Sequence, residues 1–264
     1  MRWALALLAL AGCAQAPAIP PGKIVSNNPC IDAILAEIAD PAQIGAVSVW
    51  SHDPDSGSAP VAWARQFPAV GASAEEVIAA KPALVLTGNL AVSGTNTALA
   101  KAGVRVVSVG VPATIAESRD QVLAVASAIG REVQGRTLVA RIDAVTQPKP
   151  GRLSAIIWQA SGFVPGAGTI QDQLLQRAGY VNASAHYGLN QWDVLPLETL
   201  VRNPPDVIFT PVAANGEEGR GLAARQMVLR HLAGKVRVVA FPEKLLFCAG
   251  PGVIETMRVL ESAR

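Results

Sequence analysis

The chain has 264 residues, of which 50% are hydrophobic and 16% are charged, and its formal net charge is +2. This length is enough for one large domain or for two small domains that each have a hydrophobic core. Because the sequence has no basic run and no arginine-rich helical stretch, we do not expect nucleic acid as a partner.

The N-terminus has the features of an export signal. An arginine at the second position precedes an apolar run over residues 3–11, which is too short to span a bilayer but suits a signal-peptide core. Leu-Ala-Gly-Cys at residues 10–13 matches a bacterial lipobox, in which Cys13 is lipidated. Ala-Gln-Ala at residues 14–16 is an alternative site for ordinary signal cleavage. Both interpretations predict an exported protein. We favour a lipid anchor, with residues 1–22 as leader and tether.

Strands and helices alternate over residues 23–112. Short apolar runs predict buried strands, and longer periodic stretches bounded by Pro, Gly or Asp predict helices. The expected strands are 24–26, 44–49, 83–86 and 104–109, and the expected helices are 30–39, 74–80 and 94–102. The segment 51–68 is rich in Ser, Pro, Asp and Gly, which predicts a long surface loop. Alternation of this kind is typical of a parallel sheet with helices on both faces.

A long helical pattern follows. Thr114 and Glu117 form a capping box at its start, and a proline closes it, because proline lacks the amide donor that a helix needs. Between these ends apolar residues recur three or four positions apart, with a change of phase after Gly135. We expect one helix over residues 113–148 that connects two lobes. The alternative is two ordinary helices, broken near Gly130 or Gly135.

Residues 149–264 repeat the alternation and predict a second lobe. The expected strands are 153–158, 206–209 and 236–240, and the expected helices are 169–178, 197–202, 221–232 and 251–263. The sequence therefore predicts an α/β fold of two Rossmann-like lobes joined by one long helix. A faint internal repeat supports this prediction, because Glu75 and Glu198 each lie seven residues before a proline that introduces an apolar strand.

A search for catalytic motifs yields none. The sequence has no P-loop, H-E-x-x-H, C-x-x-C or G-x-S-x-G motif, so we expect neither an enzyme nor a cofactor. In an oxidising compartment Cys30 and Cys248 either pair or remain as two partly buried thiols, and the sequence leaves both outcomes open. An exported α/β hydrolase that uses such a thiol is the alternative from another class of protein. A third possibility is a metal-ion site formed by His52, Asp53 and Cys30.

Three aromatic residues fall in loops where a ligand is expected. Aromatic residues make up only 5% of the chain, so their positions are informative. Trp50 and Phe163 each lie beyond the end of a predicted strand, and Trp192 stands in a polar loop. Loops at the carboxyl ends of parallel strands form the ligand crevice in open α/β sheets. Large rings at these positions favour a broad, partly apolar ligand that stacks on them.

The order and spacing of these features resemble the periplasmic substrate-binding proteins of iron-chelate and vitamin B12 ABC transporters. The resemblance covers residues 23–264. Its anchors in the sequence are 23–26, 29–30, 39–41, 44–47, 70–71, 75–86, 166–179, 192–209 and 250–251. Members of this family have two α/β lobes joined by one long helix, which is the architecture expected above.

This resemblance also assigns site residues. Glu75 and Glu198 match the two glutamates that dock onto arginines of the membrane permease. Ion pairs of this kind orient a partner and speed its encounter more than they add affinity. Trp50, Phe163 and Trp192 align with aromatic ligand contacts of the vitamin B12-binding member. The ligand-binding positions assigned in this way are Cys30, Trp50, Phe163, Trp192, Phe247 and Cys248.

The protein that the resemblance implies is a non-catalytic component of an ABC importer. It captures a metal chelate, either cobalamin or another corrinoid or a ferric siderophore, between its two lobes. It then delivers this ligand to the permease and ATPase complex of the inner membrane. We expect a monomer without a cofactor or a resident metal ion. A heme-binding protein of the same fold is the alternative within the family.

Overall fold

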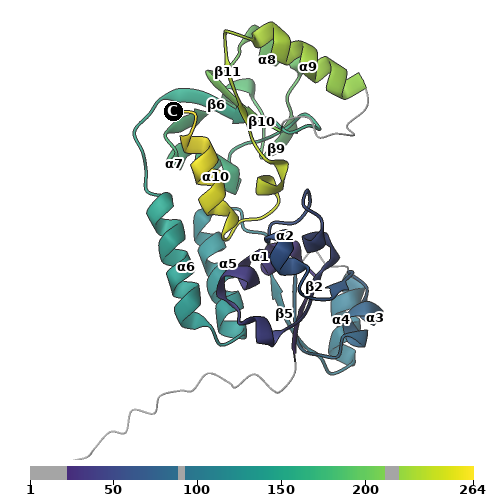
Figure 1. The fold of residues 1–264 in the computed structure, drawn as a ribbon. Coiled ribbons are helices and arrows are strands. Elements are labelled where there is room, and N and C mark those ends of the chain that lie inside the picture. The colour runs from purple at the N-terminus through teal and green to yellow at the C-terminus, as the bar shows by residue number, and fades with distance from the viewer. Residues whose placement is uncertain (1–22, 89–92, 212–219) are drawn as a thin grey trace, which may run out of the picture.

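The computed structural model describes residues 23–88, 93–211 and 220–264. Two α/β lobes lie one above the other and are joined along one side by a pair of helices (Figure 1). The lipobox and the alternative cleavage site lie outside the described residues, so lipidation of Cys13 stays a prediction. Within the described residues, no helix is both long enough and apolar enough to cross a bilayer.

The first lobe contains a five-stranded parallel sheet with the strand order β3-β2-β1-β4-β5. Its strands are β1 (Lys23–Ser26), β2 (Ile44–Ser48), β3 (Ala69–Val70), β4 (Pro82–Gly88) and β5 (Arg105–Val109). Its helices are α1 (Pro29–Ile38), α2 (Val61–Ala64), α3 (Ala74–Ala79) and α4 (Ser93–Lys101), with the 3-10 helices η1 (Pro41–Gln43) and η2 (Val49–His52). The predicted strands and helices of this lobe are confirmed. The loop predicted after β2 contains two short helical turns, η2 and α2.

The second lobe contains a four-stranded parallel sheet, β11-β10-β6-β8, and a separate antiparallel ribbon of β7 and β9. Its strands are β6 (Leu153–Ile157), β7 (Phe163–Pro165), β8 (Tyr180–Asn182), β9 (Trp192–Val194), β10 (Val207–Thr210) and β11 (Arg237–Ala240). Its helices are α7 (Ile170–Arg177), η3 (Ala185–Tyr187), α8 (Leu197–Arg202), α9 (Arg220–Leu232), η4 (Glu243–Leu246) and α10 (Gly252–Glu261). The predicted elements are confirmed. Strands β7, β8 and β9 were not predicted, because a strand this short carries no periodic pattern.

The prediction of one long helix between the lobes is wrong. The segment folds as a hairpin of two helices, α5 (Ile115–Ala128) and α6 (Glu132–Val145), which lie side by side (Figure 1). Gly130 has a φ of +68°, and the amide of Arg131 donates to the carbonyl of Ala126 at 2.8 Å. This left-handed glycine and the hydrogen bond beyond it form a Schellman motif, which ends a helix. The alternative of a break near Gly130 is therefore confirmed.

The two helices of the hairpin approach each other closely because α6 has a glycine at the contact. A Cβ built on Gly135 would lie 2.4 Å from the Cβ of Ala126, which is closer than two such atoms can pack. An ion pair between Arg119 and Asp143, at 2.9 Å, links the same two helices nearer the second lobe. The hairpin is thus packed along its length.

One hydrophobic core runs through both lobes and the helix hairpin. It includes side chains from the first sheet, from α5 and α6, and from the second sheet with α10. Examples from these parts, each at most 1% exposed, are Leu86, Val122, Leu138, Phe209 and Leu260. Two smaller clusters cover the other faces of the sheets. Because the lobes share this core, packing fixes their relative position.

A buried carboxyl group fixes the loop that follows β2. Asp32, in the first turn of α1, is fully buried, and its Oδ2 accepts hydrogen bonds from Ser48 N at 2.8 Å and Ser51 Oγ at 2.6 Å. Ser48 Oγ in turn accepts from Trp50 N at 3.3 Å. Burial raises the pKa of Asp32 to about 7, although hydrogen bonds from Ser26, Ser51 and Ser48 act in the opposite direction. The backbone that carries Trp50 therefore depends on a side chain of α1.

We expect Gly135→Ala to destabilise the protein by about 1–3 kcal/mol, because the added methyl group forces α5 and α6 apart. Helix propensity alone predicts the opposite sign, a gain of up to about 1 kcal/mol. Gly94→Ala in α4 is the matched control, since nothing lies within 4 Å of a Cβ added there. Urea unfolding of both variants measures the difference. A Gly135→Ala protein as stable as the Gly94→Ala protein would contradict the close packing.

Asp32→Asn should remove a pH dependence of stability. The pKa of Asp32 is raised from its ordinary value of 3.8 to about 7 in the folded protein, so folding takes up a proton at pH values between these two. Its contribution to stability is therefore complete below pH 4 and is lost as the pH rises through 7. The wild type should lose on the order of 2 kcal/mol between pH 5 and pH 8 from this group. Denaturant unfolding at both pH values should show a smaller loss in the variant, and an equal loss in both proteins would refute this assignment.

Candidate functional site

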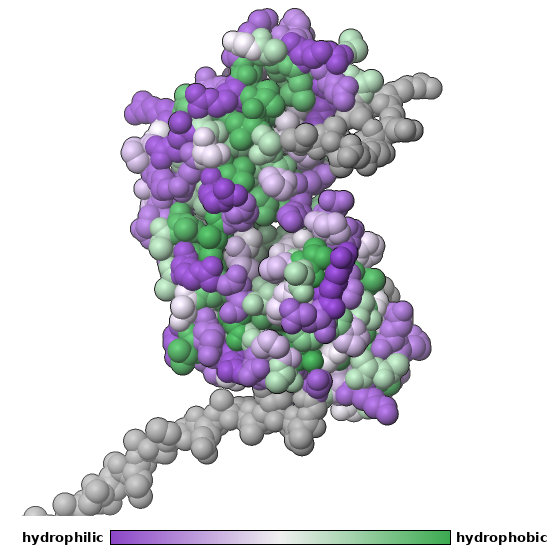
Figure 2. All heavy atoms as spheres, viewed as in Figure 1, coloured by the Kyte–Doolittle hydropathy of each residue, from purple (hydrophilic) through white to green (hydrophobic). Residues whose placement is uncertain are grey.

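The carboxyl ends of both parallel sheets face the space between the lobes. In the first lobe Asn28 follows β1, Gly88 ends β4 and Gly110 follows β5. In the second lobe Pro211 follows β10 and Phe241 follows β11. All five residues line cavities, and Figure 2 shows the molecule notched between the lobes on the side away from α6. Since ligands of open α/β sheets bind at this edge, the interlobe cleft is the candidate site.

The first cavity of the cleft has a volume of about 270 Å³, and the described residues that line it have uncharged side chains. Its polar side chains are amides and one hydroxyl, from Asn28, Gln121, Thr169, Gln171 and Gln191. Its larger apolar side chains are Val109, Val111, Ile170, Trp192, Leu246 and Phe247. This lining suits a ligand with a broad apolar face and neutral polar groups at its edge.

Three of the lining amides are held in a fixed orientation by the backbone. The Nε2 atoms of Gln121, Gln171 and Gln191 donate to the carbonyls of Gly110 at 2.7 Å, Leu246 at 3.1 Å and Gly168 at 2.7 Å, respectively. Each of these NH2 groups has a second N–H donor, and each amide also has its Oε1 acceptor. Oε1 of Gln121 is buried and has no hydrogen-bond partner among the described residues. The amides therefore suit a ligand with neutral hydrogen-bonding groups.

The β7–β9 ribbon presents an apolar face beside this cavity. Phe163 pairs with Val194, and Pro165 pairs with Trp192, so these four side chains share one face of the ribbon. Val164 points to the opposite face and is fully buried. Phe163, Trp192 and Val194 are 40%, 42% and 53% exposed, although apolar side chains of this size are normally covered. Trp192 lines the cavity, and Phe163 extends the same face beyond it.

Cys30 and Cys248 form a disulfide with a Cα–Cα distance of 5.1 Å, and both line the first cavity. The pairing that the sequence left open is thus made. Neither sulfur is a free thiol in this structure, which removes the nucleophile of the alternative thiol hydrolase.

The third alternative, a metal-ion site, involves side chains that are engaged elsewhere. His52 Nε2 lies 3.1 Å from the carbonyl oxygen of Ala64, Asp53 accepts from the hydroxyl of a neighbouring serine, and Cys30 is in the disulfide. In the part of the chain that the structure describes, no group of three or more His, Cys, Asp or Glu side chains is placed to hold a metal ion.

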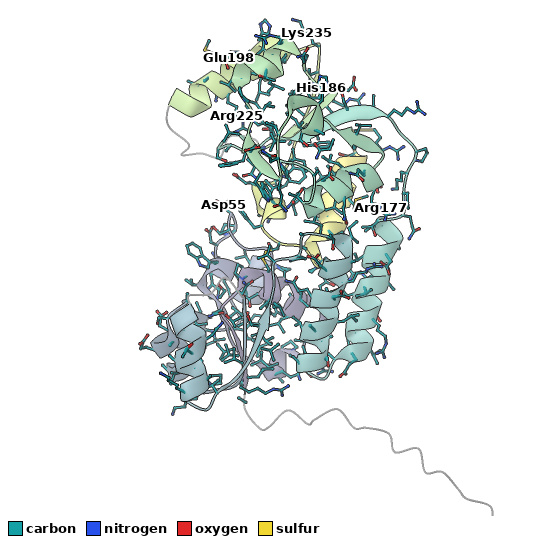
Figure 3. The ribbon with its side chains drawn as sticks, turned by 180° about the vertical axis from the view of Figure 1, so that it is seen from behind. Asp55, Arg177, His186, Glu198, Arg225 and Lys235 are labelled. Carbon is teal, nitrogen blue, oxygen red and sulfur yellow. A yellow bond between two sulfur atoms is a disulfide. The ribbon has the colours of Figure 1, made fainter. Side chains whose placement is uncertain are left out.

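A second cavity, of about 690 Å³, lies between the lobes as well. The loop 54–56 of the first lobe borders it on one side, and residues 240–244 with the outer face of α10 border it on the other. Figure 3 shows Asp55 on the edge of the first lobe that faces the second. Glu255 and Arg258 form an ion pair in its wall, and the hydrogen bond from Arg258 lowers the pKa of Glu255. Phe247 borders both cavities.

The structure brings four of the six predicted ligand-binding residues together in the first cavity, namely Cys30, Trp192, Phe247 and Cys248. Phe163 and Trp50 lie outside its lining, and Trp50 is exposed in η2 at the carboxyl end of β2. Sequence reasoning missed Asn28, residues 109–113 and the three glutamines of the lining. Asn28 and residues 110–113 follow predicted strands, so their place at a strand end was the available signal.

Glu75 and Glu198 lie on separate lobes in matching local positions. Each is exposed in the first turn of a short helix, Glu75 in α3 and Glu198 in α8. Figure 3 shows Glu198 at the end of the second lobe that is remote from the first. Neither carboxylate has an ion-pair partner among the described residues. Both are therefore available to a partner.

Known proteins of the same architecture match this chain over most of its length. A family model described as periplasmic binding protein matches residues 24–237. No curated protein matches the chain.

Among solved structures, the periplasmic heme-binding protein HutB of Vibrio cholerae is 16% identical, with a TM-score of 0.73 over 91% of this chain and 98% of HutB. The periplasmic heme-binding protein RhuT from Roseiflexus sp. RS-1, in its apo form, is 22% identical, with a TM-score of 0.69 over 92% of this chain and 98% of RhuT. The periplasmic vitamin B12-binding protein BtuF of Vibrio cholerae is 17% identical, with a TM-score of 0.66 over 92% and 96%. At these identities the likeness shows the fold.

Proposed function

The chain belongs to the periplasmic binding protein family, and we propose that it captures a corrinoid in the interlobe cleft for an ABC importer. Proteins of this family bind solutes, so we infer capture and delivery rather than catalysis. In this proposal the protein acts as a monomer in the periplasm, held to a membrane by a lipid on Cys13.

The uncharged, amide-rich lining of the first cavity is the observation that carries this proposal. A corrinoid has a broad macrocycle with carboxamide side chains around its edge. Carboxamides both donate and accept hydrogen bonds, and the amides of Gln121, Gln171 and Gln191, oriented by the backbone, are neutral groups of the same kind. The macrocycle itself presents apolar surface on which the rings of Trp192 and Phe247 can pack.

The other metal chelates make different demands on a site. Heme carries carboxylates that call for cationic side chains, and its iron takes an axial ligand such as His, Tyr, Cys or Met. Ferric catecholates carry negative charge and call for arginine or lysine. Cobalt in a corrinoid already carries its own axial ligands, so neutral amides and rings are sufficient partners. The chemistry of the lining therefore favours the corrinoid over heme and over a charged siderophore.

The exposed apolar face of the β7–β9 ribbon extends the binding surface. A corrinoid is larger than the 270 Å³ first cavity, so part of it must lie outside. Phe163 and Val194 continue the surface that starts at Trp192, and the second cavity begins beyond Phe247. In our proposal Trp50, at the end of β2, covers the ligand from the first lobe.

Delivery requires a second, polar contact. We propose that Glu75 and Glu198 dock onto arginines of the permease, one from each lobe. Both carboxylates are exposed and unpaired among the described residues, so they keep their charge for such a contact. Ion pairs at two separated points fix the orientation of the binding protein above the transporter.

Titration should rank the ligands. Cyanocobalamin should bind the oxidised protein with a dissociation constant of about 1 μM or less. Hemin and a ferric siderophore should bind at least tenfold more weakly. Tryptophan fluorescence and calorimetry measure these dissociation constants. Tighter binding of hemin or of the ferric siderophore would overturn the corrinoid assignment and favour the alternatives within the family.

Trp192→Ala should weaken cyanocobalamin binding about tenfold, because the loss of one stacked ring removes about 1–1.5 kcal/mol. Met227→Ala is the matched control, since Met227 is an exposed apolar side chain on α9 outside both cavities. Its affinity should equal that of the wild type. The same affinity in both variants would remove Trp192 from the site.

For docking, the double variant Glu75→Ala with Glu198→Ala should reduce corrinoid uptake in cells at least tenfold and leave ligand affinity unchanged. The reason is that these carboxylates act on the permease rather than on the ligand. Glu76→Ala with Asp120→Ala removes the same charge from two other exposed carboxylates and should leave uptake near the wild-type rate. Radiolabelled cyanocobalamin uptake measures this, and equal rates in both double variants would refute the docking role.

A further inference from the structure

We infer that the disulfide between Cys30 and Cys248 is a positioning element that fixes the floor of the cleft and thereby sets ligand affinity. The floor is the segment 246–250, which carries Phe247 and connects η4 to α10. The part of the inference that concerns affinity rests on the proposed function. The part that concerns the floor does not.

The bridge joins two parts of the chain that are 218 residues apart. Cys30 lies in the first turn of α1, where Asn28 caps the helix by accepting from the amide of Cys30 at 2.9 Å. Cys248 lies just before α10, in the chain that returns from the second sheet. The disulfide therefore ties the end of the second lobe to a rigid helix of the first.

Two hydrogen bonds hold the ends of the floor segment, one from the second lobe and one from the helix hairpin. Gln171 Nε2 on α7 donates to Leu246 O at 3.1 Å, and Gly250 N donates to Ser118 Oγ on α5 at 2.9 Å. Between these anchors Cys30 Sγ lies 3.4 Å from the carbonyl oxygen of Phe247. The disulfide thus holds the centre of the segment, where the chain of the second lobe contacts α1 of the first lobe.

Phe247 shows why the position of this segment matters for binding. Its side chain is 53% exposed, and it borders both cavities of the cleft. An exposed ring on a segment without this bond would sample many positions, and a ligand that ordered the ring on binding would lose affinity. A covalent bond at the adjacent residue removes most of that freedom before the ligand arrives. The cleft is then preformed, with one ring at a fixed place between its two cavities.

Amide hydrogen exchange tests the floor without any ligand. Wild-type protein is reduced with a phosphine, desalted without oxygen and compared with the oxidised form. We expect amides of residues 245–252 to exchange at least tenfold faster after reduction, with β1, β4, β6 and β10 unchanged. Cys30→Ser with Cys248→Ser should match the reduced protein. If the double variant fails to fold, exchange in the reduced wild type decides the question. If the disulfide resists reduction, exchange in the double variant decides it.

Cyanocobalamin titration of the same samples tests affinity. Reduction should weaken binding about tenfold, mostly through faster dissociation, and reoxidation should restore it. The serine double variant should bind as the reduced protein does and should not respond to the phosphine, which separates loss of the bridge from any effect on the ligand. Equal affinity of the oxidised and reduced forms overturns the inference, as does unchanged exchange in residues 245–252. If the oxidised protein does not bind cyanocobalamin, the proposed function fails, and exchange alone decides whether the disulfide fixes the floor.

Discussion

The close contact between α5 and α6 is the constraint on which the rest of the structure depends. Gly135 lets α6 lie against Ala126, and the left-handed Gly130 turns the chain so that the two helices meet. The core that passes through this hairpin reaches both sheets. As a result the lobes are held by packing rather than by a flexible linker, and the cleft between them keeps one shape. A site formed by loops of two lobes can be preformed only under this condition.

The topology decides which residues reach that cleft. Every strand pair within the two main sheets is parallel, so all the loops at carboxyl ends lie on one edge of each sheet, and these edges face each other. The chain contributes amides from α5, α7 and a loop, rings from β9 and from the floor segment, and a disulfide across it. The uncharged character of the first cavity follows from this set, while the charged side chains Glu255 and Arg258 lie at the second. The side chains that suit an uncharged ligand are thus confined to the first cavity of the cleft.

The failed prediction of a single long helix has a specific physical cause. Its outer ends were predicted correctly, because Thr114 caps α5 and prolines follow α6. The break was ambiguous, because a glycine inside an apolar stripe is compatible both with a continuous helix and with a helix end. The difference lies in whether Gly130 adopts a positive φ, and packing of Gly135 on Ala126 favours the hairpin.

The sequence by itself determined the alternation of strands and helices and the two-lobe α/β class, because these depend on local periodicity and on residues such as proline and glycine. It placed Phe163 and Trp192 in loops, whereas they lie on the short strands β7 and β9. Only the tertiary structure decided that Cys30 pairs with Cys248, that Phe247 stands between two cavities, and that glutamines of α5 and α7 line one of them. These features join residues that are far apart in the chain. Their distance in space is set by how the helix hairpin places one lobe on the other, and no local pattern encodes that placement.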